Sequence, residues 1–131
     1  MNTVVIGIGS NIKPRANIRH AIKYLAQDLK FIKESSFKIT KPLGLKDQSV
    51  FTNGAIWAHT SLGQSQLKSR LKKIENSLGR KRVRKNFGPR TVDLDILVWN
   101  NRVVHDDFFE RDFVRDSVLE LLPHLKNEHK T

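Results

Sequence analysis

Residues 87–97 read FGPRTVDLDIL and place two aspartates, Asp93 and Asp95, inside an otherwise apolar run. The run predicts a strand, on which residues two apart point to the same face, about 7 Å apart. Leu94 and Ile96 then point to the opposite face. Two like charges on one face are costly to bury unless cations lie between them, and paired carboxylates suit magnesium that carries a polyphosphate. This stretch therefore predicts a strand that takes part in a nucleotide site.

The segment just before the aspartates is strongly cationic. Gly79, Gly88 and Pro89 interrupt it, which indicates a loop rather than a helix. A cationic loop beside two carboxylates suits phosphoryl chemistry, because metal ions bridge the phosphate oxygens while guanidinium groups neutralise the developing charge. The cationic residues are Arg80, Lys81, Arg82, Arg84, Lys85 and Arg90.

Strands and helices alternate along the rest of the chain. Apolar residues recur at helical spacing in residues 14–29, with Pro14 near the first turn, and in residues 61–78, which Gly79 ends as a C-cap. A short helix is expected at residues 116–122. The repeating apolar residues are Ile18, Ile22, Leu25 and Leu29 in the first long helix and Leu67, Leu71, Ile74 and Leu78 in the second. Strands are expected at residues 3–9, 31–40, 51–60 and 91–99.

Four strands and two long helices predict an α+β fold of the ferredoxin-like sandwich type. Such a fold has a mainly antiparallel sheet of about four strands with both helices on one face, although parallel and mixed sheets stay open on the residues alone. Residues 1–131 are expected to form a single domain. Gly7 and Gly9 are interpreted as small residues that let the first helix pack against the sheet, because the dinucleotide pattern GxGxxG is not completed.

Composition excludes several classes of protein. Cysteine is absent, so disulfides and thiolate metal sites are excluded. The sequence shows no signal peptide and no run of membrane-spanning length, and we therefore expect a cytoplasmic protein. The formal charge of +11, from 24 Lys and Arg against 13 Asp and Glu, is compatible with ATP as a substrate and with nucleic acid as a partner.

Phe51 and Asn53 lie two apart on a predicted strand and therefore share a face. They offer a ring for stacking and an amide that both donates and accepts hydrogen bonds. Core packing is an alternative for Phe51, but an inward asparagine must be hydrogen-bonded. The pair therefore predicts a site for a heteroaromatic ring.

Several motifs together resemble the hydroxymethyl-dihydropterin pyrophosphokinases of the folate pathway. They are GIGSN at residues 7–11, KPLG at 41–44, FTN at 51–53, IENSLGRKR at 74–82 and GPRTVDLDIL at 88–97. Their order and spacing agree with that family up to about residue 101. The resemblance implies the same ferredoxin-like architecture. It also implies transfer of pyrophosphate from ATP to the hydroxymethyl group of 6-hydroxymethyl-7,8-dihydropterin, which leaves AMP.

The resemblance also assigns roles to individual residues. It implies that Asp93 and Asp95 hold two magnesium ions and that Arg82 and Arg90 stabilise the transferring and leaving oxygens. It implies two small-molecule substrates, ATP and the dihydropterin, and we expect a monomer that binds neither membrane nor nucleic acid. The implied pterin site comprises Thr40, Pro42, Leu43, Phe51, Asn53, Phe87 and Phe113. The implied ATP site comprises Lys72, Glu75, Arg82, Arg90, Ile96 and Arg111.

The sequence departs from the family's pattern after Val103. The stretch between Val103 and Arg111 is shortened and lacks the family's proline-histidine turn, so we interpret His105 as a loop residue. Two alternatives therefore stay open. One is a catalytically weak or altered-specificity pterin-binding paralogue. The other is a basic nucleic-acid-binding module, although such a sheet needs exposed aromatic residues where this chain has its aspartate pair.

Overall fold

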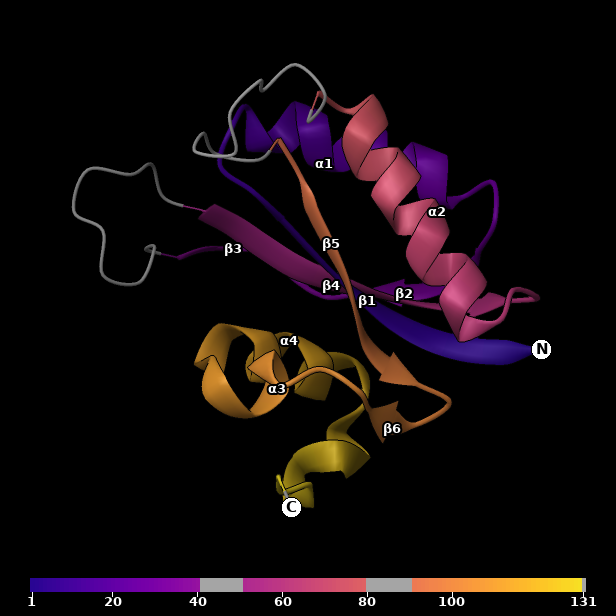
Figure 1. Cartoon of the computed structure of the whole chain (residues 1–131). Helices are drawn as coiled ribbons and strands as arrows, with labels where there is room; N and C mark the ends of the chain where they lie inside the picture. Colours follow the sequence, from indigo (N-terminus) through magenta and orange to yellow (C-terminus); the bar gives the residue numbers. More distant parts are fainter. Residues whose placement is uncertain (41–50, 80–90, 131) are drawn as a thin grey trace.

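The computed structural model describes residues 1–40, 51–79 and 91–130, and it has an open antiparallel sheet covered by helices (Figure 1). The strands are β1 (Asn2–Ser10), β2 (Lys30–Glu34), β3 (Lys38–Thr40), β4 (Phe51–Thr60), β5 (Asp93–Trp99) and β6 (Arg102–Val103). The helices are α1 (Pro14–Leu25), α2 (Gln64–Ser77), α3 (Asp107–Glu110) and α4 (Asp112–Leu121), followed by a 3₁₀ helix at Pro123–Asn127.

The sheet order is β2-β4-β1-β5-β6, and β3 also pairs with β4. All of these pairings are antiparallel, so the predicted α+β class and the antiparallel character of the sheet are confirmed. The expected number of about four strands is wrong, because the described residues form six.

Two local features explain the additional strands. The predicted strand at residues 31–40 divides at Ser35, whose Oγ accepts the Ala55 N–H at 2.8 Å and so takes the place of a main-chain acceptor. At the other end of the sheet, Asn100 and Asn101 have φ values of 49° and 67°. Asparagine tolerates this left-handed conformation, which makes a tight hairpin from β5 to β6.

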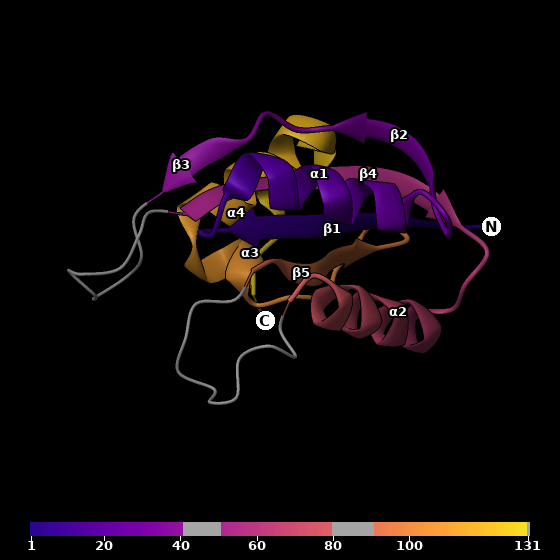
Figure 2. The same cartoon turned by 90° about the horizontal axis from the view of Figure 1, so that it is seen from above.

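Helices cover both faces of the sheet (Figures 1 and 2). Helices α1 and α2 lie on one face, as expected, and pack on the alternating residues Val4, Ile6 and Ile8 of β1. Helices α3 and α4 cover the opposite face, where Phe108 and Val118 pack in a second core cluster with β1 and β5. The second layer was not predicted. Helix α4 of this layer begins at Asp112, four residues before the expected start of the helix at 116–122.

A bulge in β5 decides which way its side chains point. Val5 pairs with Val98 and Ile6 pairs with Ile96, so Leu97 is an extra residue between them. Leu97 and Val98 both contribute to the cluster beneath α4. The four residues of β5 that precede the bulge keep the predicted alternation. Leu94 and Ile96 belong to the core beneath α1 and α2, so the two aspartates of β5 face the α3 and α4 side.

Candidate active site

The register of the three central strands brings predicted site residues into one row. Gly9 of β1 pairs with Asn53 of β4 on one side and with Asp93 of β5 on the other. In the adjacent row, Gly7 pairs with Asp95. Because neighbouring strands lie about 4.8 Å apart, the Asn53 and Asp93 backbones are separated by about 10 Å across a glycine.

Gly7 and Gly9 leave room for side chains of the neighbouring strands on this face of the sheet. A Cβ atom on Gly9 would lie 2.5 Å from Oδ1 of Asn53, and one on Gly7 would lie 2.9 Å from Cδ1 of Leu97. The interpretation that these glycines let the first helix pack is therefore wrong. Their free side is the one opposite α1, since it is Ile6 and Ile8 that face α1. Gly9 instead makes room for the Asn53 amide.

Three of the predicted pterin residues lie together at the end of β3 and β4. Thr40 pairs with Phe51, and Nδ2 of Asn53 donates a hydrogen bond to Oγ1 of Thr40. This bond fixes the amide so that Oδ1 of Asn53 points toward Gly9. Phe51 shares the face of Asn53 and lies close to the same glycine. Pro42, Leu43 and Phe87, which the resemblance also assigns to the pterin site, lie outside the described residues.

A cavity of about 250 Å³ lies between α2 and β5, on the other side of the aspartate strand. It brings together three predicted ATP residues, Lys72, Glu75 and Ile96, with Asp95. Its lining residues are Gln64, Lys68, Leu71, Lys72, Glu75, Leu94, Asp95, Ile96, Val104 and His105. The cavity therefore reaches one of the two predicted metal ligands, Asp95, from the edge of β5 that faces α2.

Glu75 is buried, with 5 % of its surface exposed, and its Oε2 accepts the Leu94 N–H at 2.8 Å. This contact ties α2 to the outer edge of β5. Along a strand the N–H and C=O groups of every second residue point the same way, so those of Ile96 also point outward, into the cavity. The cavity wall thus offers a main-chain donor beside a main-chain acceptor.

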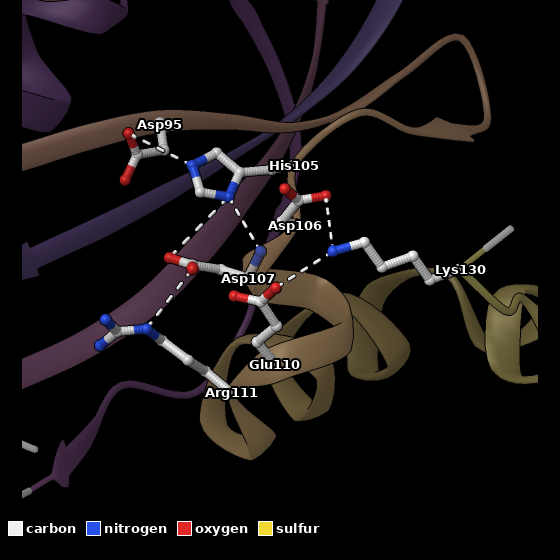
Figure 3. A network of polar contacts seen from close by, with 7 residues as sticks. All are labelled: Asp95, His105, Asp106, Asp107, Glu110, Arg111 and Lys130. Atoms are coloured by element: carbon white, nitrogen blue, oxygen red, sulfur yellow. Dashed lines mark hydrogen bonds and ion pairs between the residues drawn. The ribbon is translucent and has the colours of Figure 1, made fainter.

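His105 joins the site although it was expected to be only a loop residue (Figure 3). The Asp107 N–H donates to its Nδ1 at 3.1 Å, and Oδ2 of Asp107 lies 3.8 Å from the same nitrogen. Nε2 faces Oδ1 of Asp95 at 3.8 Å. Sequence reasoning missed this approach because it depends on the β5–β6 hairpin, and the paired asparagines at 100 and 101 are the signal that could have revealed it.

Arg111 and Phe113 lie where α3 passes into α4. Nε of Arg111 is 3.4 Å from Oδ1 of Asp107, and the side chain is 41 % exposed (Figure 3). Phe113 is half-buried in the first turn of α4, the helix that covers the aspartate face. The predicted catalytic residues Arg82 and Arg90 lie outside the described residues.

The aspartate pair suits magnesium. Within residues 1–40, 51–79 and 91–130, no group of three or more His, Cys, Asp or Glu residues could form a metal site built from protein ligands alone. Magnesium does not need one, because it keeps several waters and is usually bound by one or two carboxylates together with substrate phosphates. Asp93 and Asp95 supply two carboxylates on one face, and Asp95 is open enough, at 51 % exposure, to reach a ligand.

Comparison with known proteins shows which family the sequence matches. Residues 5–123 match the family model described as 7,8-dihydro-6-hydroxymethylpterin-pyrophosphokinase. The chain is 35 % identical over 132 residues to the 2-amino-4-hydroxy-6-hydroxymethyldihydropteridine pyrophosphokinase of Haemophilus influenzae, which covers 92 % of this chain and 82 % of that protein. It is 37 % identical over 138 residues to the enzyme of the same name from Bacillus subtilis, covering 97 % and 82 % respectively.

The chain is also similar to part of a bifunctional plant protein. The mitochondrial folate synthesis bifunctional protein of Pisum sativum is 35 % identical over 129 residues, which cover 91 % of this chain and 25 % of that protein. The matches run through both the aspartate strand and the strands that carry Thr40 and Asn53. The chain belongs to the 7,8-dihydro-6-hydroxymethylpterin-pyrophosphokinase family.

Proposed function

We propose that this protein transfers pyrophosphate from ATP to the hydroxymethyl group of 6-hydroxymethyl-7,8-dihydropterin and releases AMP, as a step in folate synthesis. The observation that carries the proposal is the place of the aspartate pair between two candidate subsites. Asp93 lies in one row with Asn53, and Asp95 lines the cavity beside α2. The aspartate pair therefore lies between a proposed ring-binding surface and the cavity beside α2, which Asp95 lines.

The pterin binds, in this proposal, on the face formed by β3 and β4. The Asn53 amide, oriented by Thr40, recognises the polar edge of the ring, because it offers both a donor and an acceptor. Phe51 and Phe113 supply aromatic faces for stacking. Pro42, Leu43 and Phe87 complete the walls, as the resemblance implies.

ATP occupies the cavity between α2 and β5. The main-chain N–H and C=O of Ile96 hydrogen-bond the edge of the base, and Glu75 keeps this strand edge in place through Leu94. Lys72 and Arg111 attract the anionic part of the nucleotide. This arrangement directs the triphosphate along β5 toward Asp95.

Asp93 and Asp95 would hold two magnesium ions, which would supply charge neutralisation for the triphosphate when bound. The chain's own residues contribute orientation, because the two subsites hold the hydroxyl and the β-phosphorus close together. Arg82 and Arg90 neutralise charge that develops on the transferring and leaving oxygens. The new bond joins the hydroxymethyl oxygen to the β-phosphorus, the bond from that phosphorus to the AMP oxygen breaks, and the hydroxyl proton leaves to solvent.

Three further features concern membrane spans, the fold and the oligomeric state. No helix in the described parts of the chain is long and apolar enough to cross a membrane. The order β1-α1-β2-β4-α2-β5 and the sheet order β2-β4-β1-β5 support a ferredoxin-like core with β3, β6, α3 and α4 added to it. We also propose that the protein acts as a monomer in the cytoplasm, since both subsites come from one chain.

The test is to incubate the protein with ATP, magnesium and the dihydropterin and to measure AMP. We expect AMP to form only when all three are present. Pterin binding without formation of AMP would favour a pterin-binding paralogue. The shortened stretch after Val103 is the reason for considering that alternative. Tight, salt-sensitive RNA binding without pterin binding would favour the nucleic-acid-binding alternative.

Replacing Glu75 by Ala is expected to raise the KM for ATP and leave the KM for the pterin unchanged. The change leaves the Leu94 N–H without its carboxylate acceptor beside the cavity, which costs about 1–3 kcal/mol of stability. Steady-state kinetics with each substrate varied in turn, together with thermal melting, measure both effects. Asn76→Ala, at the exposed neighbouring position, is the control. An equal rise in both KM values would argue against a nucleotide role for this wall.

The lysines at the cavity predict a salt-dependent affinity for ATP. Lys68 and Lys72 line the cavity and are exposed, so their attraction to the triphosphate weakens as the Debye length falls from about 10 Å at 0.1 M to about 3 Å at 1 M salt. Calorimetric titration of ATP over this range is expected to show a steep loss of affinity in the native protein. In the double variant K68Q/K72Q the affinity for ATP should fall less steeply with salt concentration than in the native protein. In K30Q/K33Q, on the distant β2, it should fall as steeply as in the native protein. Equal slopes in all three proteins would contradict the prediction.

A further inference from the structure

Glu120 on α4 holds a distant segment of the chain through two hydrogen bonds. Its Oε2 accepts the Ser36 N–H at 2.9 Å, and its Oε1 accepts the Ser36 hydroxyl at 2.7 Å. The two residues are 84 positions apart in the sequence. Both carboxylate oxygens are used for one residue, which fixes the relative position of its main chain and the helix.

Ser36 lies at the corner where β2 ends and β3 begins. On one side of it, Ser35 is hydrogen-bonded to Ala55 of β4 in both directions, through its N–H at 2.9 Å and its Oγ at 2.8 Å. On the other side, the Phe37 ring covers Gly54 so closely that a Cβ there would lie 2.6 Å from it. The corner is therefore fixed to β4 by Ser35 and Phe37, and to α4 by Ser36.

This corner leads directly into a wall of the proposed pterin site. β3 begins two residues after Ser36 and ends at Thr40, whose hydroxyl oxygen accepts the Asn53 amide. The three residues of this short strand pair with β4 in one register, in which Thr40 lies opposite Phe51. Ser36 is therefore four residues before the partner of the Asn53 amide.

α4 carries the other proposed wall, Phe113. Phe113 and Glu120 are seven residues apart, about two turns at 3.6 residues per turn, and so they project from the same side of the helix. Figure 1 shows α4 crossing the sheet face below β4, on the side away from α1 and α2. The bond to Ser36 thus links the helix with the stacking ring to the strand with the threonine.

We propose that Glu120 is a positioning residue for the pterin site, which sets the spacing between α4 and β3 by holding Ser36. The inference rests on the proposed function, since it assigns the purpose of the spacing to pterin binding. It predicts that Glu120 affects pterin affinity without touching the substrate, the nucleotide or the reacting atoms.

The charge state of Glu120 supports this role. The hydrogen bonds from the Ser36 hydroxyl and then from its N–H lower the pKa of the Glu120 carboxyl, and Lys38 and Lys33 add a smaller effect in the same direction. The carboxyl is therefore ionised at neutral pH. Hydrogen bonds to an ionised acceptor are stronger than those between neutral groups.

The experiment compares Glu120→Ala with Glu120→Gln, with Asp116→Ala as a control that removes a carboxylate from an exposed position of the same helix. Glu120→Ala is expected to raise the pterin KM about threefold to tenfold, while kcat and the ATP KM change by less than about twofold. Glutamine keeps both contacts, since its carbonyl accepts the N–H and its amide donates to the hydroxyl. E120Q should therefore restore the pterin KM, and D116A should not change it.

A second variant tests the partner. Ser36→Ala keeps the main-chain N–H and should give a smaller rise than Glu120→Ala, and the S36A/E120A protein should be no worse than E120A alone. Additive effects would contradict a direct link. An unchanged pterin KM in E120A, or an equal rise for both substrates, would overturn the proposal.

The readout also separates this proposal from the proposed function. Pterin affinity is measured by calorimetry in the presence of α,β-methylene-ATP, which lacks the bond that the transfer breaks. A native protein that binds pterin but forms no AMP would reject the enzymatic function, while a loss of affinity in E120A would still support the positioning role. A native protein that binds no pterin would reject both.

Discussion

Asp95→Ala is expected to reduce turnover on the order of 10³-fold at saturating magnesium, because charge stabilisation by bound metal is worth several kcal/mol and each tenfold change corresponds to about 1.4 kcal/mol. Asp93→Ala should behave in the same way. Both carboxylates lie on the face between the two proposed subsites, and each is expected to hold metal there. The measurement is kcat for AMP formation over a range of magnesium concentrations.

The fold of these variants should persist. The Asp95 side chain is 51 % exposed, and substitutions at such positions usually change the free energy of unfolding by about 0.5 kcal/mol or less. Asp106→Ala is a suitable control. Asp106 is 70 % exposed and forms an ion pair with Lys130, near the end of the chain. Near-normal turnover in Asp95→Ala at saturating magnesium would show that the metal assignment is wrong.

Gly9→Ala is expected to lower pterin affinity about tenfold to a hundredfold. The added Cβ would lie 2.5 Å from Oδ1 of Asn53, so the amide must move away and lose its bond to Thr40. Overpacking of this kind costs about 1–3 kcal/mol, and each 1.4 kcal/mol or so is a factor of ten in affinity. Calorimetric titration of the dihydropterin in the presence of α,β-methylene-ATP measures the effect.

Gly7→Ala is the matched control for this prediction. Gly7 is two residues away on the same strand and face, but its added Cβ would meet the flexible end of Leu97 at 2.9 Å. We therefore expect Gly7→Ala to lower the melting temperature while it leaves pterin affinity within about threefold of the native value. Equal losses of pterin affinity in the two variants would indicate general damage to the sheet rather than displacement of Asn53.

Local sequence patterns were sufficient to predict the central strands and the two long helices. The alternation around Asp93 and Asp95 predicted that both point to one face, and the β5 register agrees, because the bulge comes only at Leu97. The strand at residues 51–60 was predicted with its observed bounds. These features depend on side-chain periodicity within one segment, and this information is present in the sequence.

Features that depend on contacts between distant segments were not predicted. Periodicity did not show that Gly9 would pair with both Asn53 and Asp93, so the glycines were assigned to the wrong face. The approach of His105 to Asp95 requires the hairpin at Asn100. The link between Ser36 and Glu120 joins residues that are 84 positions apart in the sequence. The family resemblance implied residue roles, but it did not show that Asp95 lines the cavity beside α2 and lies on the same face as the proposed pterin site.

The most direct test of the central claim uses ATP labelled with ³²P on its β-phosphate, together with magnesium and the dihydropterin. Pyrophosphoryl transfer predicts that the label moves to the pterin product and that unlabelled AMP forms in equal amount. Label that remained in ADP would indicate transfer of a single phosphoryl group. Label in free pyrophosphate, with no labelled pterin, would indicate hydrolysis, and either result would contradict the proposed function.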